Sequence, residues 1–279
     1  MKPSVALSGV FLSTVIFVFV AYVQLRSLQE TTSGAETMYT TVEENAVNDA
    51  NPMVPSVTQQ TTAGYSGARV EMISWAPRIM VVDNIMSPEE CEELLRMAEP
   101  GLEKSTVVNV ADGKSIPSSV RTSMGAFLSS HQQKSNPTLL RVEQRLAEIT
   151  MLPPENGEAL QVLRYEGGQY YRPHHDFFAD EFNKKRGGQR VCTVLMYLTT
   201  PEEGGETVFP QAGGFGSKCQ CGGKEVRGMS VKPQVGRAVI FWSQDPTGKE
   251  DPKSLHGGCE VVKGVKWSAT KWIRSGKFV

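Results

Sequence analysis

The sequence predicts a mainly β fold with flanking helices and a transmembrane helix near its N-terminus. After Pro154 the chain runs through short β-rich segments separated by glycines, a spacing typical of a barrel or a sandwich. Two stretches with helical signals precede these segments. A long uncharged run lies close to the start of the chain. Together these observations indicate two helices that brace a β core, attached to a membrane.

The uncharged run, Val5–Leu25, is 21 residues long. A membrane-spanning helix needs about 20 apolar residues. The apolar part is longer than that of a signal peptide, and no small-residue cleavage site follows it, so we expect an uncleaved signal anchor. Lys2 and Arg26 flank the run and give little help with its orientation. The acidic segment that follows is easily translocated, so we expect residues 1–26 to be a cytosolic tip and a single-pass type II anchor.

Residues 27–68 are rich in Thr, Ser, Asn and Gly, contain no Lys or Arg, and show no hydrophobic period. Such a segment cannot bury enough apolar surface to offset the loss of chain entropy on folding. We therefore predict a flexible lumenal stem over 27–68 and a catalytic domain over 69–279.

Composition excludes some classes of protein. The chain has 29 basic and 30 acidic residues, so nothing indicates nucleic-acid binding. Its five cysteines are too few for a disulfide scaffold, and their number is odd. Cys219 and Cys221 lack nearby ligands for zinc, and a disulfide from their loop requires an oxidising compartment. The sequence leaves the pairing open among Cys91, Cys192, Cys219, Cys221 and Cys259.

Two helices are predicted from their caps and periodicity. Ser87 suits the N-cap of the first, Pro88 its first position, and Glu90 completes a capping box. This helix should end near Glu99. The second spans about Pro137–Met151 and has one apolar face. Strands are expected at VEMISW, RIMVVDNIM, ALQVLRY, VCTVLMYL, ETVF, MSVKP, RAVIFW and KWSATKWI.

The candidate metal-binding side chains lie in two segments that are far apart in the sequence. His174 and Asp176 are two residues apart, so on a strand they share a face. His256 lies about eighty residues later, and three of the four histidines fall in these two segments. Two imidazoles and one carboxylate form the facial triad that holds non-haem Fe(II) and leaves three coordination positions open. Lys266 can hold a dicarboxylate co-substrate by its far end, while His175 should face away from the metal.

The segments YEGGQYYRPHHDFF, GGQRVCTVLMYLTTPEEGGETVFP and SLHGGCEVVKGVKWSATKWI resemble the prolyl 4-hydroxylases, especially the single-chain plant and algal type. The resemblance covers about residues 70–279. It implies a double-stranded β-helix (jelly-roll) core, with Fe(II), 2-oxoglutarate as co-substrate and ascorbate as reductant. The implied reaction is 4-hydroxylation of proline in proline-rich peptides that adopt polyproline II, with release of succinate and CO2.

The resemblance also implies an endoplasmic reticulum or Golgi membrane location and, as partners, secretory-pathway proteins of the hydroxyproline-rich glycoprotein type. It assigns iron binding to His174, Asp176 and His256. It assigns 2-oxoglutarate binding to Lys266, Tyr165 and Thr207. The residues that it places at the peptide site, the last two in a closing loop, are Tyr171, Arg190, Trp272, Arg121 and Ser123.

Two other interpretations stay open. One is a related dioxygenase that acts on another peptidyl residue, such as lysine; lysyl hydroxylases are expected to have Arg where this chain has Lys266. The other is an inactive, membrane-tethered jelly-roll binding module, which the intact triad argues against. The segment QAGGFGSKCQCGGKEVRG fits the family least well, and the oligomeric state is not predicted.

Overall fold

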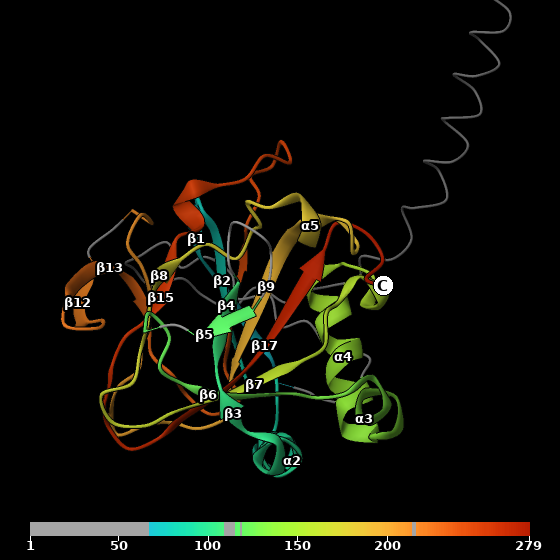
Figure 1. The fold of residues 1–279 in the computed structure, drawn as a ribbon, viewed down its shortest axis with the longest axis horizontal. Coiled ribbons are helices and arrows are strands. Elements are labelled where there is room, and N and C mark those ends of the chain that lie inside the picture. Colours follow the sequence, from blue (N-terminus) through green and yellow to red (C-terminus); the bar gives the residue numbers. More distant parts are fainter. Residues whose placement is uncertain (1–66, 109–114, 118, 214–215) are drawn as a thin grey trace, which may run out of the picture. The chain divides into compact units, whose positions relative to one another are not determined.

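The computed structural model describes residues 67–108, 115–117, 119–213 and 216–279. The predicted anchor and nearly all of the predicted stem lie outside these residues. Within the described part, no helix combines the length and the apolar character needed to cross a membrane. The described chain is mainly β, with two antiparallel sheets and few helices (Figure 1).

The larger sheet has eight strands, and every neighbouring pair in it is antiparallel. In spatial order they are β1 (Arg69–Trp75), β2 (Arg78–Asp83), β14 (Ala238–Trp242), β9 (Arg190–Tyr197), β17 (Lys266–Arg274), β7 (Gln161–Tyr165), β6 (Met124–Phe127) and β3 (Glu103–Lys104). All the strands predicted for this sheet are present, because each is rich in β-branched or aromatic residues.

The smaller sheet has five antiparallel strands. Their spatial order is β12 (Ser217–Gln220), β13 (Glu225–Val231), β11 (Thr207–Phe209), β15 (His256–Gly258) and β8 (Tyr171–His174). Two short ribbons complete the strands, one of β10 (Glu203–Gly204) with β16 (Val261–Lys263) and one of β4 (Thr106–Val108) with β5 (Ser115–Pro117).

The two predicted helices are confirmed. Helix α2 (Pro88–Ala98) begins after Ser87, whose side chain accepts from the backbone nitrogen of Glu90, while the Glu90 carboxylate accepts from the backbone nitrogen of Ser87, which completes the capping box. Helix α4 (Pro137–Thr150) is capped by Asn136, a cap that the sequence analysis missed. The shorter elements are α3 (Ser130–Ser135), α5 (Glu181–Lys184) and the 3₁₀ turns η1 (Glu99–Gly101), η2 (Pro154–Asn156) and η3 (Pro252–Ser254).

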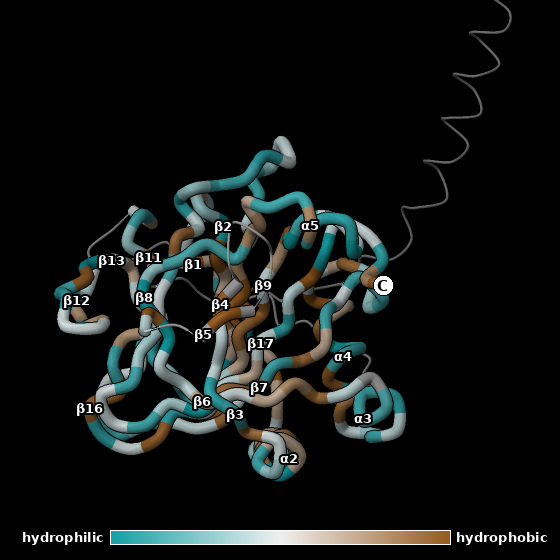
Figure 2. The backbone as a smooth tube through the Cα atoms, in the orientation of Figure 1, coloured by the Kyte–Doolittle hydropathy of each residue, from teal (hydrophilic) through white to brown (hydrophobic). Residues whose placement is uncertain are grey.

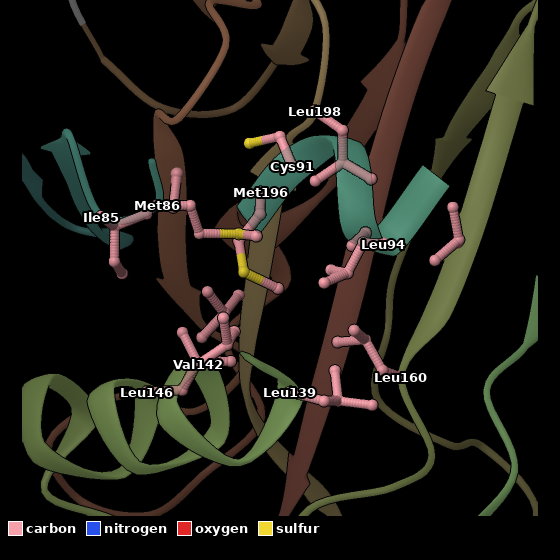
Figure 3. Packing of buried hydrophobic residues seen from close by; sticks show 14 of the residues in the cluster. Ile85, Met86, Cys91, Leu94, Leu139, Val142, Leu146, Leu160, Met196 and Leu198 are labelled. Atoms are coloured by element: carbon pink, nitrogen blue, oxygen red, sulfur yellow. The ribbon is translucent and has the colours of Figure 1, made fainter. Parts of the chain in front are cut away.

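The larger sheet separates two cores, because its side chains alternate between its faces. On β9, Val194 and Met196 belong to the core that includes α2 and α4, while Tyr197 belongs to the core shared with the smaller sheet. Figure 3 shows Leu94 of α2 and Leu146 of α4 near Met196 on the helix side. Hydrophobic residues accordingly gather in the central strands, while the surrounding loops are mainly hydrophilic (Figure 2).

Aromatic residues pack the space between the two sheets. Phe209 of the smaller sheet meets Phe241 of the larger sheet edge to face, with ring centroids 5.2 Å apart. Val231 of the smaller sheet and Val239 of the larger one are buried in the same cluster. This packing fixes the two sheets against each other and leaves a pocket beside it.

Candidate active site

Strand pairing brings the two predicted motif segments together. His174 ends β8, His256 begins β15, and the two residues are direct partners in the antiparallel pairing of these strands. Asp176 lies two residues past the end of β8, in a bend, so the expectation that it shares a strand with His174 was wrong. One ligand atom from each of the three residues lies within 4.8 Å of the others.

Backbone carbonyls set the orientation of both imidazoles. Nδ1 of His174 lies 2.9 Å from the carbonyl oxygen of Arg172, and Nδ1 of His256 lies 3.0 Å from that of Ser254. A carbonyl can only accept a hydrogen bond, so each Nδ1 carries the proton and each Nε2 presents a lone pair. The two Nε2 atoms lie 3.6 Å and 3.5 Å from the carboxylate oxygens of Asp176.

Burial and charge give Asp176 and His256 the ionisation that a metal site requires. Burial lowers the pKa of His256 to about 4, against the opposing attraction of Asp176. Burial would raise the pKa of Asp176, but His256, His174 and Arg190 together hold it far below its usual range. At neutral pH the site therefore offers an anionic carboxylate and a neutral imidazole, the forms that bind metal. The donor set, two nitrogens and one oxygen, fits Fe(II).

A pocket of about 460 Å³ opens between the two sheets at this cluster. It brings together nine of the predicted site residues: His174, Asp176, His256, Lys266, Tyr165, Thr207, Tyr171, Trp272 and Arg121. Their roles remain predictions, but the structure places their side chains around one space.

Lys266 lies at the pocket with its ammonium group buried. Its Nζ atom donates to the carbonyl oxygen of Gly205 at 2.6 Å and lies over the rings of Tyr165 and Tyr197. Burial lowers its pKa to about 8, and Glu206 offsets this only in part. In the described part of the chain no ion pair joins Lys266 to a carboxylate. A buried cation without a counter-ion is costly, so a bound anion fits this place.

Tyr165 and Thr207 flank that lysine from two strands. Tyr165 is the pairing partner of Lys266 in the register of β7 with β17. Thr207, on β11, accepts a hydrogen bond from the hydroxyl of Tyr197 at 2.7 Å. Its hydroxyl proton is therefore available for a second acceptor in the pocket.

Arg190 does not line the pocket. Its guanidinium forms a two-pronged ion pair with Glu158, at 2.6 Å and 2.7 Å, and stacks on the indole of Trp272. Glu158 also accepts from Arg274. Arg190 can therefore affect a peptide through the orientation of Trp272, while its Nε and Nη2 atoms donate to Glu158 within the protein.

The predicted closing loop splits into two environments. Arg121 lines the pocket, donates to Gln161 at 3.0 Å and stacks on Tyr171. Ser123 is fully buried and donates to Ser105 at 2.9 Å, outside the pocket lining. Direct contact of Ser123 with a substrate has no support in this arrangement.

Sequence reasoning missed several pocket residues. They are Leu163, Thr193, Leu195, Phe241, Gly257, Gly258, Ser268 and Thr270. A signal was present for some of them: Ser268 and Thr270 follow Lys266 in steps of two along β17, and residues spaced by two on a strand share a face. Applied to the predicted strands, this alternation would have found them.

The cysteines resolve into one disulfide and three buried thiols. Cys219 of β12 is bonded to Cys259, which follows β15. The thiol of Cys221 donates to the carbonyl oxygens of Tyr171 and Gly258. The CxC segment therefore holds the β12–β13 hairpin against the strands that carry the two histidines. The other two histidines are separate from the cluster: His175 faces Pro252, and His131 is exposed.

Comparison with known proteins agrees with this geometry. A family model described as the 2OG-Fe(II) oxygenase superfamily matches residues 160–274. The chain is 57% identical over 204 residues to prolyl 4-hydroxylase 1 of Arabidopsis thaliana, covering 73% of this chain and 71% of the relative. It is 49% identical over 216 residues to prolyl 4-hydroxylase 5 of the same plant, covering 75% and 72%.

A solved structure is also similar. It is the viral collagen prolyl hydroxylase of Paramecium Bursaria Chlorella virus-1 in its 2OG complex, with a TM-score of 0.52 and 27% identity. The match covers 70% of this chain and 94% of the viral chain.

Proposed function

Because this chain belongs to the prolyl 4-hydroxylase family of 2-oxoglutarate- and Fe(II)-dependent oxygenases, we propose that it hydroxylates C4 of proline in proline-rich peptides of secretory-pathway proteins. The observation that carries the proposal is a His-Asp-His cluster in one pocket with a buried lysine that has no carboxylate partner among the described residues. When bound, Fe(II) and 2-oxoglutarate activate O2 for insertion of one oxygen atom, and succinate and CO2 are released.

The residues of the site have different proposed roles, according to the chemistry of their side chains. His174, Asp176 and His256 would hold the metal ion, and Lys266 would receive the distal carboxylate of 2-oxoglutarate. A compact ammonium suits a point contact of this kind. Thr207 would add a hydroxyl donor to the same carboxylate. The apolar side chains of Leu163, Leu195 and Phe241 in the pocket wall would limit the access of water to the reacting centre.

Aromatic side chains at the pocket fit a proline-rich peptide. Polyproline II segments dock on aromatic surfaces without a large ordering cost. Tyr171 stacks on the ring of His174 at 3.6 Å, and Trp272 lines the same pocket. A proline bound beside Tyr171 would therefore lie close to the metal ligands. Arg121, which stacks on Tyr171, would support that wall.

We also propose that the catalytic domain has a double-stranded β-helix core and works in the lumen of the endoplasmic reticulum or Golgi. The support for the core is its two facing antiparallel sheets. The support for the location is the uncharged run Val5–Leu25 in the sequence and the Cys219–Cys259 disulfide, which persists in oxidising compartments. Hydroxyproline-rich glycoproteins are the expected substrates in such a compartment.

The test is product analysis with the purified protein. We expect succinate release and 4-hydroxyproline when Fe(II), 2-oxoglutarate, ascorbate and a polyproline peptide are supplied. A lysine-rich collagen-like peptide is the matched alternative substrate, and the His174→Ala protein is the blank. Formation of hydroxylysine without hydroxyproline would show that the enzyme acts on lysine rather than proline. No turnover with either peptide would favour a binding module.

A further inference from the structure

Asp176 differs from the two histidines in how its backbone is held. The histidines lie on paired strands, whereas Asp176 lies in the bend beyond β8. Its carboxylate is almost completely buried. A short, rotatable side chain on irregular backbone needs another contact to fix the direction of its oxygens.

Thr193 supplies such a contact from the centre of the larger sheet. Its Oγ1 atom donates to Oδ2 of Asp176 at 2.7 Å, and both residues line the pocket. The direction of this hydrogen bond is fixed, because an ionised carboxylate only accepts. Thr193 is 1% exposed, so water does not compete for the bond.

Strand pairing on both sides of β9 holds Thr193 in place. On β9 it pairs with Phe241 of β14 and with Trp272 of β17. A β-branched side chain in a central strand has few accessible rotamers. Its hydroxyl is therefore held at a fixed place beside Asp176.

The bend that contains Asp176 is held by β9 at a second point. The side-chain amide of Gln189, next to the start of β9, accepts from the backbone nitrogen of Phe178 at 2.6 Å and donates to its carbonyl oxygen at 2.9 Å. Gln189 thus fixes the backbone of the bend, and Thr193 fixes the carboxylate within it.

We propose that Thr193 is a positioning residue of the metal site: its hydroxyl holds Oδ2 of Asp176 and thereby fixes the direction in which the carboxylate faces the metal. This inference rests on the proposed iron-binding role of the triad. In this orientation Oδ1 lies 3.6 Å from Nε2 of His174, and Oδ2 lies 3.5 Å from Nε2 of His256. The backbone carbonyls that orient both histidines act in the same way, so each of the three predicted ligands has an outer partner. Such partners typically change metal affinity about 10–100-fold when removed.

The experiment compares Co(II) binding, as a stand-in for Fe(II), to the full-length protein without 2-oxoglutarate, by competition with a chelator. Thr193→Val removes the hydroxyl with little change of shape and should weaken Co(II) binding about 10–100-fold. Thr193→Ser keeps a hydroxyl and should bind close to the parent protein. Thr150→Val is the matched control: it removes another buried threonine hydroxyl, bonded to Leu146 on α4, and should leave the affinity unchanged.

Thermal unfolding of the metal-free proteins accompanies the titrations. If Thr193→Val does not fold, the Co(II) affinities of Thr193→Ala and Thr193→Ser are compared instead. Unchanged affinity in Thr193→Val, or an equal loss in Thr193→Ser, would overturn the positioning role, the latter because shape rather than the hydroxyl would then matter. If the parent protein and His174→Ala bind Co(II) equally, the iron site itself is misassigned, which is a separate failure.

Discussion

His174 and His256 face each other as cross-strand partners of β8 and β15, and each ring is oriented by the carbonyl oxygen two residues before it. Two segments about eighty residues apart thus present their imidazoles with the same tautomer. One register position accounts for both nitrogen ligands of the proposed iron site.

Substitution of either histidine should abolish Co(II) binding and turnover, but the two changes should differ in stability. The ring of His256 lies 4.4 Å from that of Phe241 and is buried, whereas His174 is half-buried. We expect His256→Ala to lower the free energy of unfolding by about 2–3 kcal/mol through the cavity that it leaves, and His174→Ala by less. Denaturant unfolding of the metal-free proteins measures the difference. An active His256→Ala protein would refute the metal assignment.

Replacing Lys266 by Ala should raise the dissociation constant for 2-oxoglutarate about 10–100-fold, since a charge-assisted contact contributes about 1.5–3 kcal/mol. The peptide KM should change little. Lys271 is the matched control, because it lies on the same strand, is equally buried and faces α4, where it pairs with Glu143 at 2.7 Å. Lys271→Ala should reduce stability and leave 2-oxoglutarate binding intact. A larger effect of Lys266→Ala on peptide KM would give the lysine a different role.

Binding of 2-oxoglutarate should weaken as pH rises above about 8, where the buried Lys266 loses its proton. The dianion itself does not titrate in this range, so the affinity should fall up to tenfold per pH unit. Lys266→Arg keeps its charge to higher pH and should flatten this dependence. Titrations between about pH 7 and 9.5 provide the measurement, and a flat profile for the parent protein would contradict the expected ionisation.

The same shift has an opposite effect on the stability of the ligand-free protein. Because burial lowers the pKa of Lys266 from 10.5 to about 8, the unfolded chain binds more protons than the folded one between these values. This group's contribution to stability therefore increases as pH rises through that window. Comparing the pH dependence of unfolding between the parent protein and Lys266→Met isolates the contribution of Lys266, because methionine does not titrate.

Loss of the Cys219–Cys259 disulfide should lower the free energy of unfolding by about 2–4 kcal/mol, as expected for a closed loop of this length. The bond joins residues 40 apart and ends three residues after His256, so metal affinity should weaken as well. Unfolding and Co(II) binding of a Cys219→Ser/Cys259→Ser protein test both effects. Reductant should reproduce the change in the parent protein and do nothing further to the double variant.

Much of the fold could be predicted from the sequence because the signals are local. Ser87 and Glu90 mark a helix start through contacts within one turn, and alternation along β9 and β17 identifies strands and their faces. The pairing of strands is not local. Nothing in the spacing of Cys219, Cys221 and Cys259 says which two sulfur atoms meet, because that depends on how the β12–β13 hairpin folds back onto β15.

Residues of the candidate site could be predicted where their residue type is rare in the chain, and less well where it is common. Histidine is rare in this chain and Lys266 follows His256 by ten residues, so the triad and Lys266 could be singled out from the sequence. A threonine in a hydrophobic strand is ordinary, and Thr193 acquires meaning only beside Asp176. Arg190 and Ser123 were assigned by resemblance, and their contacts with Glu158 and Ser105 depend on segments that are distant in sequence.

Strand β17 presents Lys266 to the pocket on one side and hydrophobic packing on the other, with β7 and β9 hydrogen-bonded along its edges. Insertion or deletion of one residue would exchange these sides, turning Ala269 toward the cavity and Lys266 toward the helices. We therefore expect changes of chain length to be tolerated only in the loops at the ends of β17. Attempts to alter substrate selectivity from this strand have three positions to vary without disturbing the packing behind it: 268, 270 and 272.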